Sequence, residues 1–197
     1  MKSKKFLIFT FFIINLIGIN YSYSMEPDIF VQSIVSRASE ALNNKNSKEK
    51  KIEKLMQIAR ETVDINGIGF YTLGAYRKNI SEKEISQYEI LFEQYFLKSF
   101  SSRLAEYSNP EIEVLSKEKL NENYTIVSSI LVGTEQRPEV KIDWRIYTKN
   151  KENPLIRDLI IEGLSLARTQ KEEFSSIIQS NNEDINALFS ALKKFIE

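Results

Sequence analysis

The hydrophobic repeat of this chain changes at Pro110, and this change limits the folds that the sequence can adopt. From Ser81 to about Tyr107, apolar residues recur every three or four positions, which is the spacing of one face of an α-helix. Ser81 and Glu84 have the spacing of a capping box, so we expect the helix to begin there. Pro110 ends the pattern, because its ring cannot continue a helix. The sequence therefore predicts one long amphipathic helix, followed by a region of different structure.

Beyond Pro110 the apolar residues alternate with polar ones, which is the period of a half-buried β-strand. In the clearest case, valine, isoleucine and tryptophan alternate with Lys141, Asp143 and Arg145. Short connections rich in turn residues separate this run from three similar ones. The four runs are 111–117, 123–132, 139–148 and 154–163. They predict a four-stranded antiparallel meander, with the charged face of the third strand toward solvent.

Shorter helical patterns flank this meander on both sides. They cover residues 28–44, 48–62, 64–79 (as one or two short turns), 164–179 and 183–195. Helices, then a meander, then helices are typical of an α+β fold. We therefore expect a curved four-stranded antiparallel sheet covered on one face by several α-helices.

The first 24 residues have the layout of a signal peptide. Three lysines near the start precede an apolar run at 6–19, and small residues at Ser22 and Ser24 favour cleavage after Ser24. The apolar run is too short to span a bilayer comfortably. Retention as an N-terminal anchor is the alternative. We expect residues 25–197 to form the exported, soluble protein, with residues 1–24 removed.

The composition disfavours several classes of function. The chain has no histidine and no cysteine, so zinc, copper, haem and iron–sulfur sites lack their usual ligands. Its 27 basic residues balance 27 acidic ones, and removal of the three lysines of the signal segment leaves a slight negative charge. Nucleic acid is therefore not an expected partner, because binding it requires a clustered basic surface. No cofactor is expected.

Gly163, Ser165 and Ala167 have the spacing of a serine-hydrolase elbow, with alanine in place of the last glycine. A seryl nucleophile needs a base, and without histidine no residue is marked as its partner. Serine at this place is also a helix cap, and this interpretation is favoured because it requires nothing further. The carboxylates of Asp158 and Glu162 lie roughly 13 Å apart along a strand, too far for a glycosidase pair. They are expected to be solvated or paired with Arg157 or Arg168. The sequence predicts no enzyme.

The apolar faces of the long helix and of the sheet allow two interpretations. They can form a filled core, as most hydrophobic faces do. They can also line a cavity between sheet and helices, large enough for an apolar ligand. The first alternative describes an exported, non-enzymatic interaction protein that acts through its surface.

Several segments resemble the MlaC family, also called toluene-tolerance proteins. These are Asp64, "LGAY" at 73–76, the Ser81-capped helix with "FEQYFLKSF", "RDLIIEGLSL" at 157–166, and Phe174, whose order and intervals agree over about 60–180. The sequence departs from the family at Arg77, at 154–157 and at 170–171. None of these departures affects a catalytic group.

The resemblance implies a periplasmic phospholipid carrier of the Mla system, with 25–197 as a single carrier domain around an apolar pocket. Such a carrier shuttles lipid between an outer-membrane lipoprotein–porin complex and an inner-membrane ABC transporter complex with an MCE-domain subunit. This transport maintains outer-membrane lipid asymmetry, and the family performs no hydrolysis.

Together, the patterns and the resemblance predict which side chains line the pocket. From the helices they are Phe70, Leu73, Tyr76, Phe92, Tyr95, Phe96 and Phe100. From the strands they are Val114, Ile126, Ile130, Val140, Ile142, Trp144, Ile146, Leu159 and Ile161. A charged residue at Ile142 or Ile130 is expected to abolish lipid co-purification.

Overall fold

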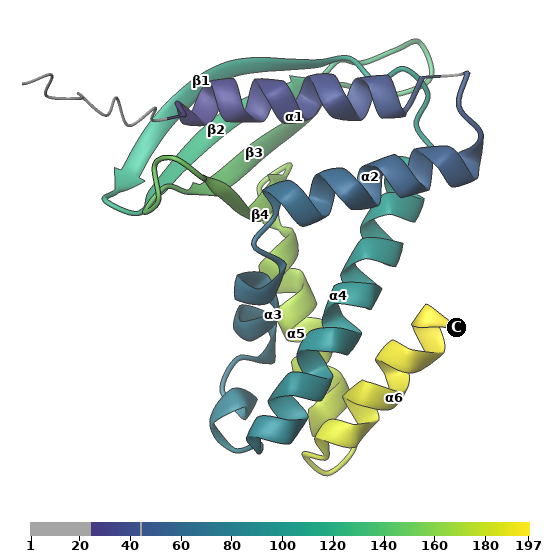
Figure 1. Cartoon of the computed structure of the whole chain (residues 1–197), viewed down its shortest axis with the longest axis vertical. Helices are drawn as coiled ribbons and strands as arrows, with labels where there is room; N and C mark the ends of the chain where they lie inside the picture. Colours follow the sequence, from purple (N-terminus) through teal and green to yellow (C-terminus); the bar gives the residue numbers. More distant parts are fainter. Residues whose placement is uncertain (1–24, 44) are drawn as a thin grey trace, which may run out of the picture.

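The computed structural model describes residues 25–43 and 45–197; the expected signal peptide lies outside these residues. The described chain is an α+β fold in which helices precede and follow one antiparallel sheet (Figure 1). The helices are α1 (Pro27–Ala41), α2 (Lys48–Thr62), α3 (Ile65–Leu73), the 3₁₀ turn η1 (Tyr76–Lys78), α4 (Glu82–Leu104), α5 (Leu166–Gln179) and α6 (Ile185–Ile196). No helix among the described residues combines the length and the apolar character that crossing a bilayer requires.

The sheet is a meander in which each strand pairs with the next in sequence order, and this confirms the predicted topology. Its strands are β1 (Ile112–Asn121), β2 (Tyr124–Leu131), β3 (Val140–Tyr147), β4 (Leu155–Ile161) and β5 (Leu164–Ser165). The two-residue strand β5 was not expected. It forms because Glu162 and Gly163 both adopt positive φ, 49° and 81°, and turn the chain back onto β4. Gly163 adopts this conformation without strain.

The helices form two groups rather than one cover over the sheet. In Figure 1, α1 lies along the sheet beside β1 and β2, and α2 continues from it. Helices α3, α4, α5 and α6 extend away from the sheet as a second layer, packed mainly on one another. The expectation that the helices pack together on one face of the sheet is therefore wrong for this second group. The N-terminal half of α4 has its own helical partners, because Tyr88 and Phe92 pack on α5.

An aromatic core holds the second layer together. Tyr88 and Phe92 of α4 meet the ring of Phe174 from α5 edge to face, with centroids 6.4 and 6.2 Å apart. The hydroxyl of the buried Tyr88 is 2.7 Å from that of Thr72 in α3. Burial raises the pKa of Tyr88 well above its ordinary value, so the phenol stays neutral. The aromatic stripe read from the sequence thus belongs largely to this core.

Asp64 joins the second layer to the sheet. One carboxylate oxygen accepts a hydrogen bond from the backbone N–H of Gly67 and caps α3, at 2.9 Å. The other pairs with the guanidinium of Arg157 on β4, at 2.6 Å. The backbone N–H of Asp64 also donates to the carbonyl of Ile156. The start of α3 is therefore fixed against β4.

The register of the sheet decides which side chains face the helices. Val127 pairs with Trp144, and Ser129 with Ile142, on the inner face toward α1 and α2. Lys141, Asp143 and Arg145 lie on the outer face, as predicted for the third strand.

Candidate functional site

An apolar cavity of about 170 Å³ lies between the sheet and the helices. Its walls come from α1, α2, the C-terminal half of α4 and the segment after it, and the inner face of the sheet. Nearly all of the lining is aliphatic or aromatic. The buried part includes Ile34, Val35, Leu42, Leu55, Ile58, Trp144 and Ile156. A space of this kind can take apolar matter.

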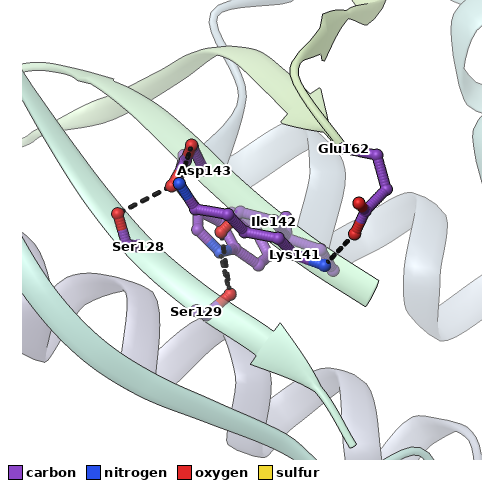
Figure 2. Close-up of polar contacts among 7 residues, drawn as sticks. Ser128, Ser129, Lys141, Ile142, Asp143 and Glu162 are labelled. Atoms are coloured by element: carbon purple, nitrogen blue, oxygen red, sulfur yellow. Dashed lines mark hydrogen bonds and ion pairs between the residues drawn. The ribbon is translucent and has the colours of Figure 1, made fainter. Parts of the chain in front are cut away.

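The few polar atoms in the wall already have protein partners. The indole N–H of Trp144 donates to the hydroxyl of Ser129 at 2.8 Å. This hydroxyl lies 3.1 Å from the carbonyl of Ile142, and Figure 2 shows Ser129 and Ile142 on neighbouring strands. The hydroxyls of Thr62 and Ser39 donate to the backbone carbonyls of Ile58 and Pro110. Across the described ranges, no buried side-chain nitrogen or oxygen lacks a hydrogen bond. The deep part of the cavity therefore offers a ligand van der Waals contact and no unused donor.

From the partly buried lining residues, we infer that the cavity opens between the end of α4 and the ends of two strands. On one side, the lining residues at and after the end of α4 are only partly buried: Phe100, Leu104 and Tyr107. On the other side, the partly buried lining residues are 140 and 142 of β3 and 159 and 161 of β4. The lining contributed by α2, in contrast, is buried. A ligand that enters here reaches the deep part between α1, α2 and β3.

Six of the predicted lining residues do come together around this cavity. They are Phe100, Val140, Ile142, Trp144, Leu159 and Ile161. Strand pairing explains the group, because Ile142 lies opposite Ile161, and Trp144 opposite Leu159, on the inner face. The alternation of β3 was the most regular in the sequence, and its predicted inner-face residues do lie on the inner face, opposite those of β4.

The structure places the other helical candidates outside the cavity. Leu73 and Phe92 are buried in the second helical layer, and Tyr95 and Phe96 pack beside Phe92. Phe70 is exposed, and Tyr76 lies in η1, partly buried against the helical core. The α4 residues among them lie on the face that packs within the second layer, and the others belong to α3 and η1. The sequence pattern could not show that α4 changes partners along its length.

The remaining strand candidates also lie away from the cavity lining. Ile146 is fully buried on the inner face, and Val114 is partly buried on β1. Ile126 and Ile130 pair with Arg145 and Lys141 and thus lie on the outer face. Their expected inward orientation is wrong. Strand β2 is apolar on both faces, so its alternation alone could not fix its register.

The first two helices provide the part of the wall that sequence reasoning missed. Ile34, Val35 and Ala38 of α1 and Leu55 and Ile58 of α2 face the cavity. Their helical spacing was visible in the sequence and marked a buried face. Only the tertiary arrangement shows that this face borders a cavity.

Ser165 is a helix cap, as favoured from the sequence. Its hydroxyl accepts a hydrogen bond from the backbone N–H of Arg168 at 3.1 Å and donates to the carboxylate of Asp158 at 2.6 Å. The carboxylate of Asp158 also accepts from the backbone N–H of Ala167 and lies 3.5 Å from the guanidinium of Arg145. Asp158 is buried, so the expectation of a solvated carboxylate, or of pairing with Arg157 or Arg168, is wrong. The Ser165–Asp158 pair stabilises the start of α5.

A second hollow, of about 390 Å³, lies between α3 and the outer face of the sheet near Tyr124. It is wider open than the first, and its lining is more polar. Its two arginines, Arg145 and Arg157, are already paired with Asp158 and Asp64. The enclosed apolar cavity is therefore the better candidate site, although its volume is smaller.

The fold and this cavity define an α+β protein with an internal apolar cavity. A sequence profile described as MlaC protein matches residues 31–194, so the chain belongs to the MlaC family. This confirms the resemblance seen in the sequence. No curated protein matches this sequence.

The solved structures include one with the same fold. It is a phospholipid-binding protein from Ralstonia solanacearum in complex with a phospholipid. The two chains are 16% identical, with a TM-score of 0.72, over 87% of this chain and 97% of the other.

Proposed function

We propose that this protein is a phospholipid carrier that holds acyl chains in the apolar cavity and leaves the headgroup at the opening. The observation that carries the proposal is the cavity itself, an apolar space in which no buried side-chain nitrogen or oxygen of the described residues lacks a hydrogen bond. The phospholipid-binding protein of the same fold supports this choice of ligand. Because the deep wall is mostly apolar and no buried side-chain nitrogen or oxygen of the described residues lacks a partner, hydrocarbon is the ligand part that fits there.

Energetics allow such a carrier both to load and to release its lipid. Two acyl chains of about 30 methylenes gain some 24 kcal/mol on leaving water, at about 0.8 kcal/mol for each methylene. A bilayer shelters the same methylenes, so exchange between membrane and cavity is close to neutral. The direction of net transport must then come from the docking partners rather than from the cavity.

Loading also requires the cavity to widen. Pockets for small ligands usually measure about 300–1,000 Å³, and the present volume is below that range. Helices α1 and α2 form the wall opposite the sheet, and α1 is held there by buried side chains such as Val31 and by ion pairs at the surface. Lys117 of β1 pairs with Glu26 and Asp28 at 2.6 and 2.8 Å, and such exposed pairs contribute little stability. We propose that this wall moves outward when lipid enters.

Family membership and the N-terminal sequence support the cellular role that we propose. Residues 1–24 direct export to the periplasm and are cleaved near Ser24, which leaves 25–197 as one carrier domain. There the protein exchanges phospholipid with an outer-membrane lipoprotein–porin complex and an inner-membrane ABC transporter complex bearing an MCE-domain subunit, and so maintains outer-membrane lipid asymmetry.

Lipid extraction tests the proposal directly. The protein is purified from a Gram-negative host without detergent, extracted with organic solvent and analysed by mass spectrometry, with an exported protein of similar size as the control. We expect phospholipid near one molecule for each protein chain. The extraction is repeated after the protein has been incubated with phospholipid vesicles. If neither extract is richer in lipid than the control, the filled-core interaction protein is favoured instead.

A further inference from the structure

An arginine lies at the rim of the cavity opening. The guanidinium of Arg137, in the connection between β2 and β3, sits over the ring of Tyr107 at 5.0 Å from its centroid. Tyr107 follows α4 and lines the cavity, as do Leu131 and Val140 on either side of the connection. The Arg137–Tyr107 contact therefore spans the two sides of the opening at one end.

The backbone around Arg137 is well constrained. Thr134 and Arg137 exchange two backbone hydrogen bonds, of 2.7 and 3.2 Å, which close the connection into a tight turn. The backbone of Gly133 packs so closely on the return chain that a Cβ there would lie 2.8 Å from the nitrogen of Glu139. Because the turn is fixed and the guanidinium rests on an aromatic ring, little side-chain freedom remains to be lost on binding.

The guanidinium of Arg137 is also available to an anion. Arg37, Arg60, Arg145 and Arg157 are each paired with a carboxylate, whereas the ion pairs found within 25–43 and 45–197 do not include Arg137. Arginine offers donors in a planar fork that fits a phosphate group. An unpaired guanidinium at the entrance of a hydrocarbon cavity is placed for a ligand with an apolar body and a phosphate end.

We propose that Arg137 binds the phosphate of the loaded lipid and makes the carrier prefer phospholipids over uncharged diacylglycerols. This inference rests on the proposed function, because it assumes acyl chains in the cavity. With the chains between α2 and β3, the glycerol phosphate lies at the opening, within the span that Arg137 and Tyr107 bridge. The contact is exposed, so it provides a modest preference and leaves the rest of the headgroup in water.

A competition between two lipids of identical chains tests this role. The protein is incubated with vesicles of dioleoylphosphatidylglycerol that contain a minor fraction of dioleoylglycerol, re-isolated and extracted, and the ratio of the two bound lipids is measured. Relative to wild type, we expect R137Q to lower the ratio of phospholipid to diacylglycerol by roughly three- to tenfold, the range for a partly solvated charge-assisted contact. R137K should restore part of the preference, because it keeps the charge without the fork.

The matched control is R77Q. Arg77 is also exposed and lies in η1, far from the cavity lining, with its guanidinium on the carbonyl of Phe70. R77Q should bind phospholipid and diacylglycerol in the same ratio as wild type. If R137Q takes up lipid in the wild-type ratio, the role of Arg137 is wrong while the carrier function stands. If wild type itself takes up neither lipid, the proposed function fails instead.

Discussion

The indole N–H of Trp144 and the hydroxyl of Ser129 form a hydrogen bond of 2.8 Å between neighbouring strands, inside the apolar wall of the cavity. The hydroxyl is fully buried, and Trp144 is 7% exposed. Trp144 is also the only tryptophan of the chain. Its fluorescence therefore reports on this one position in the cavity wall.

Removal of this hydroxyl should destabilise the protein and change its emission. The substitution S129A leaves the indole N–H buried without a partner, which costs about 1–3 kcal/mol in the free energy of unfolding. Urea denaturation followed by circular dichroism measures the loss. In a double-mutant cycle with W144F, the two effects should be less than additive, because each substitution removes the same bond. Strict additivity would show that the bond contributes nothing.

A charge on the inner face of the sheet should abolish lipid loading, and a charge on the outer face should not. Ile142 lines the cavity, and Ile130 lies on the opposite face beside Lys141. We expect I142D to be purified without phospholipid, because a carboxylate in hydrocarbon loses its hydration. I130D, the matched control, should keep its lipid. This replaces the sequence-based expectation that both substitutions act alike.

A second substitution separates loss of the cavity from loss of the fold. Ala38 of α1 lines the cavity and is only partly buried, so a larger side chain there has space to enter. A38F should remain folded by circular dichroism and carry much less lipid by mass spectrometry. A folded A38F with full lipid content would show that the acyl chains lie elsewhere.

Ser165 should matter for stability and not for catalysis. The substitution S165A removes a helix cap and one partner of the buried Asp158, and should cost about 0.5–2 kcal/mol. S190A, on the exposed face of α6, should change stability by less than about 0.5 kcal/mol and serves as control. Lipid content should be unchanged in both variants. An ester-cleaving activity of the wild type that disappears in S165A would revive the nucleophile interpretation.

Acid should weaken the attachment of α1 to the sheet. The hydrogen bond from Lys117 holds the pKa of Asp28 below its ordinary value. A carboxyl with a lowered pKa in the folded state stabilises the protein above the ordinary carboxyl pKa, near 4, and this stabilisation is lost as the pH falls through the lowered value.

Comparison with K117M reveals this contribution. Thermal unfolding should show wild type slightly more stable than K117M at neutral pH, by at most about 1 kcal/mol for an exposed pair. The difference should vanish at acid pH and shrink with added salt. A difference that persists at low pH would assign the effect to packing of the Lys117 side chain rather than to its charge.

Much of the secondary structure could be predicted because its signals are local. The capping box at Ser81 and Glu84 is present, helix α2 covers the predicted residues, and the meander follows the order of the four predicted runs. Strand β5 had no local signal beyond Gly163, since two residues are too few for a period. The partners of the long helix could not be predicted, because an apolar stripe does not specify which elements it packs against.

The sequence by itself determined most of the helices and strands, the family and the caps at Ser81 and Ser165, because periodicity and capping depend on neighbours a few positions apart. It also determined that Trp144 and Ile142 share one face of a strand. Only the tertiary structure decided which face of β2 points inward, since both faces are apolar, and that α1 and α2 rather than most of α4 complete the cavity. Whether apolar side chains fill a space or surround it depends on contacts between segments far apart in the chain. A local sequence pattern does not encode how closely such segments pack.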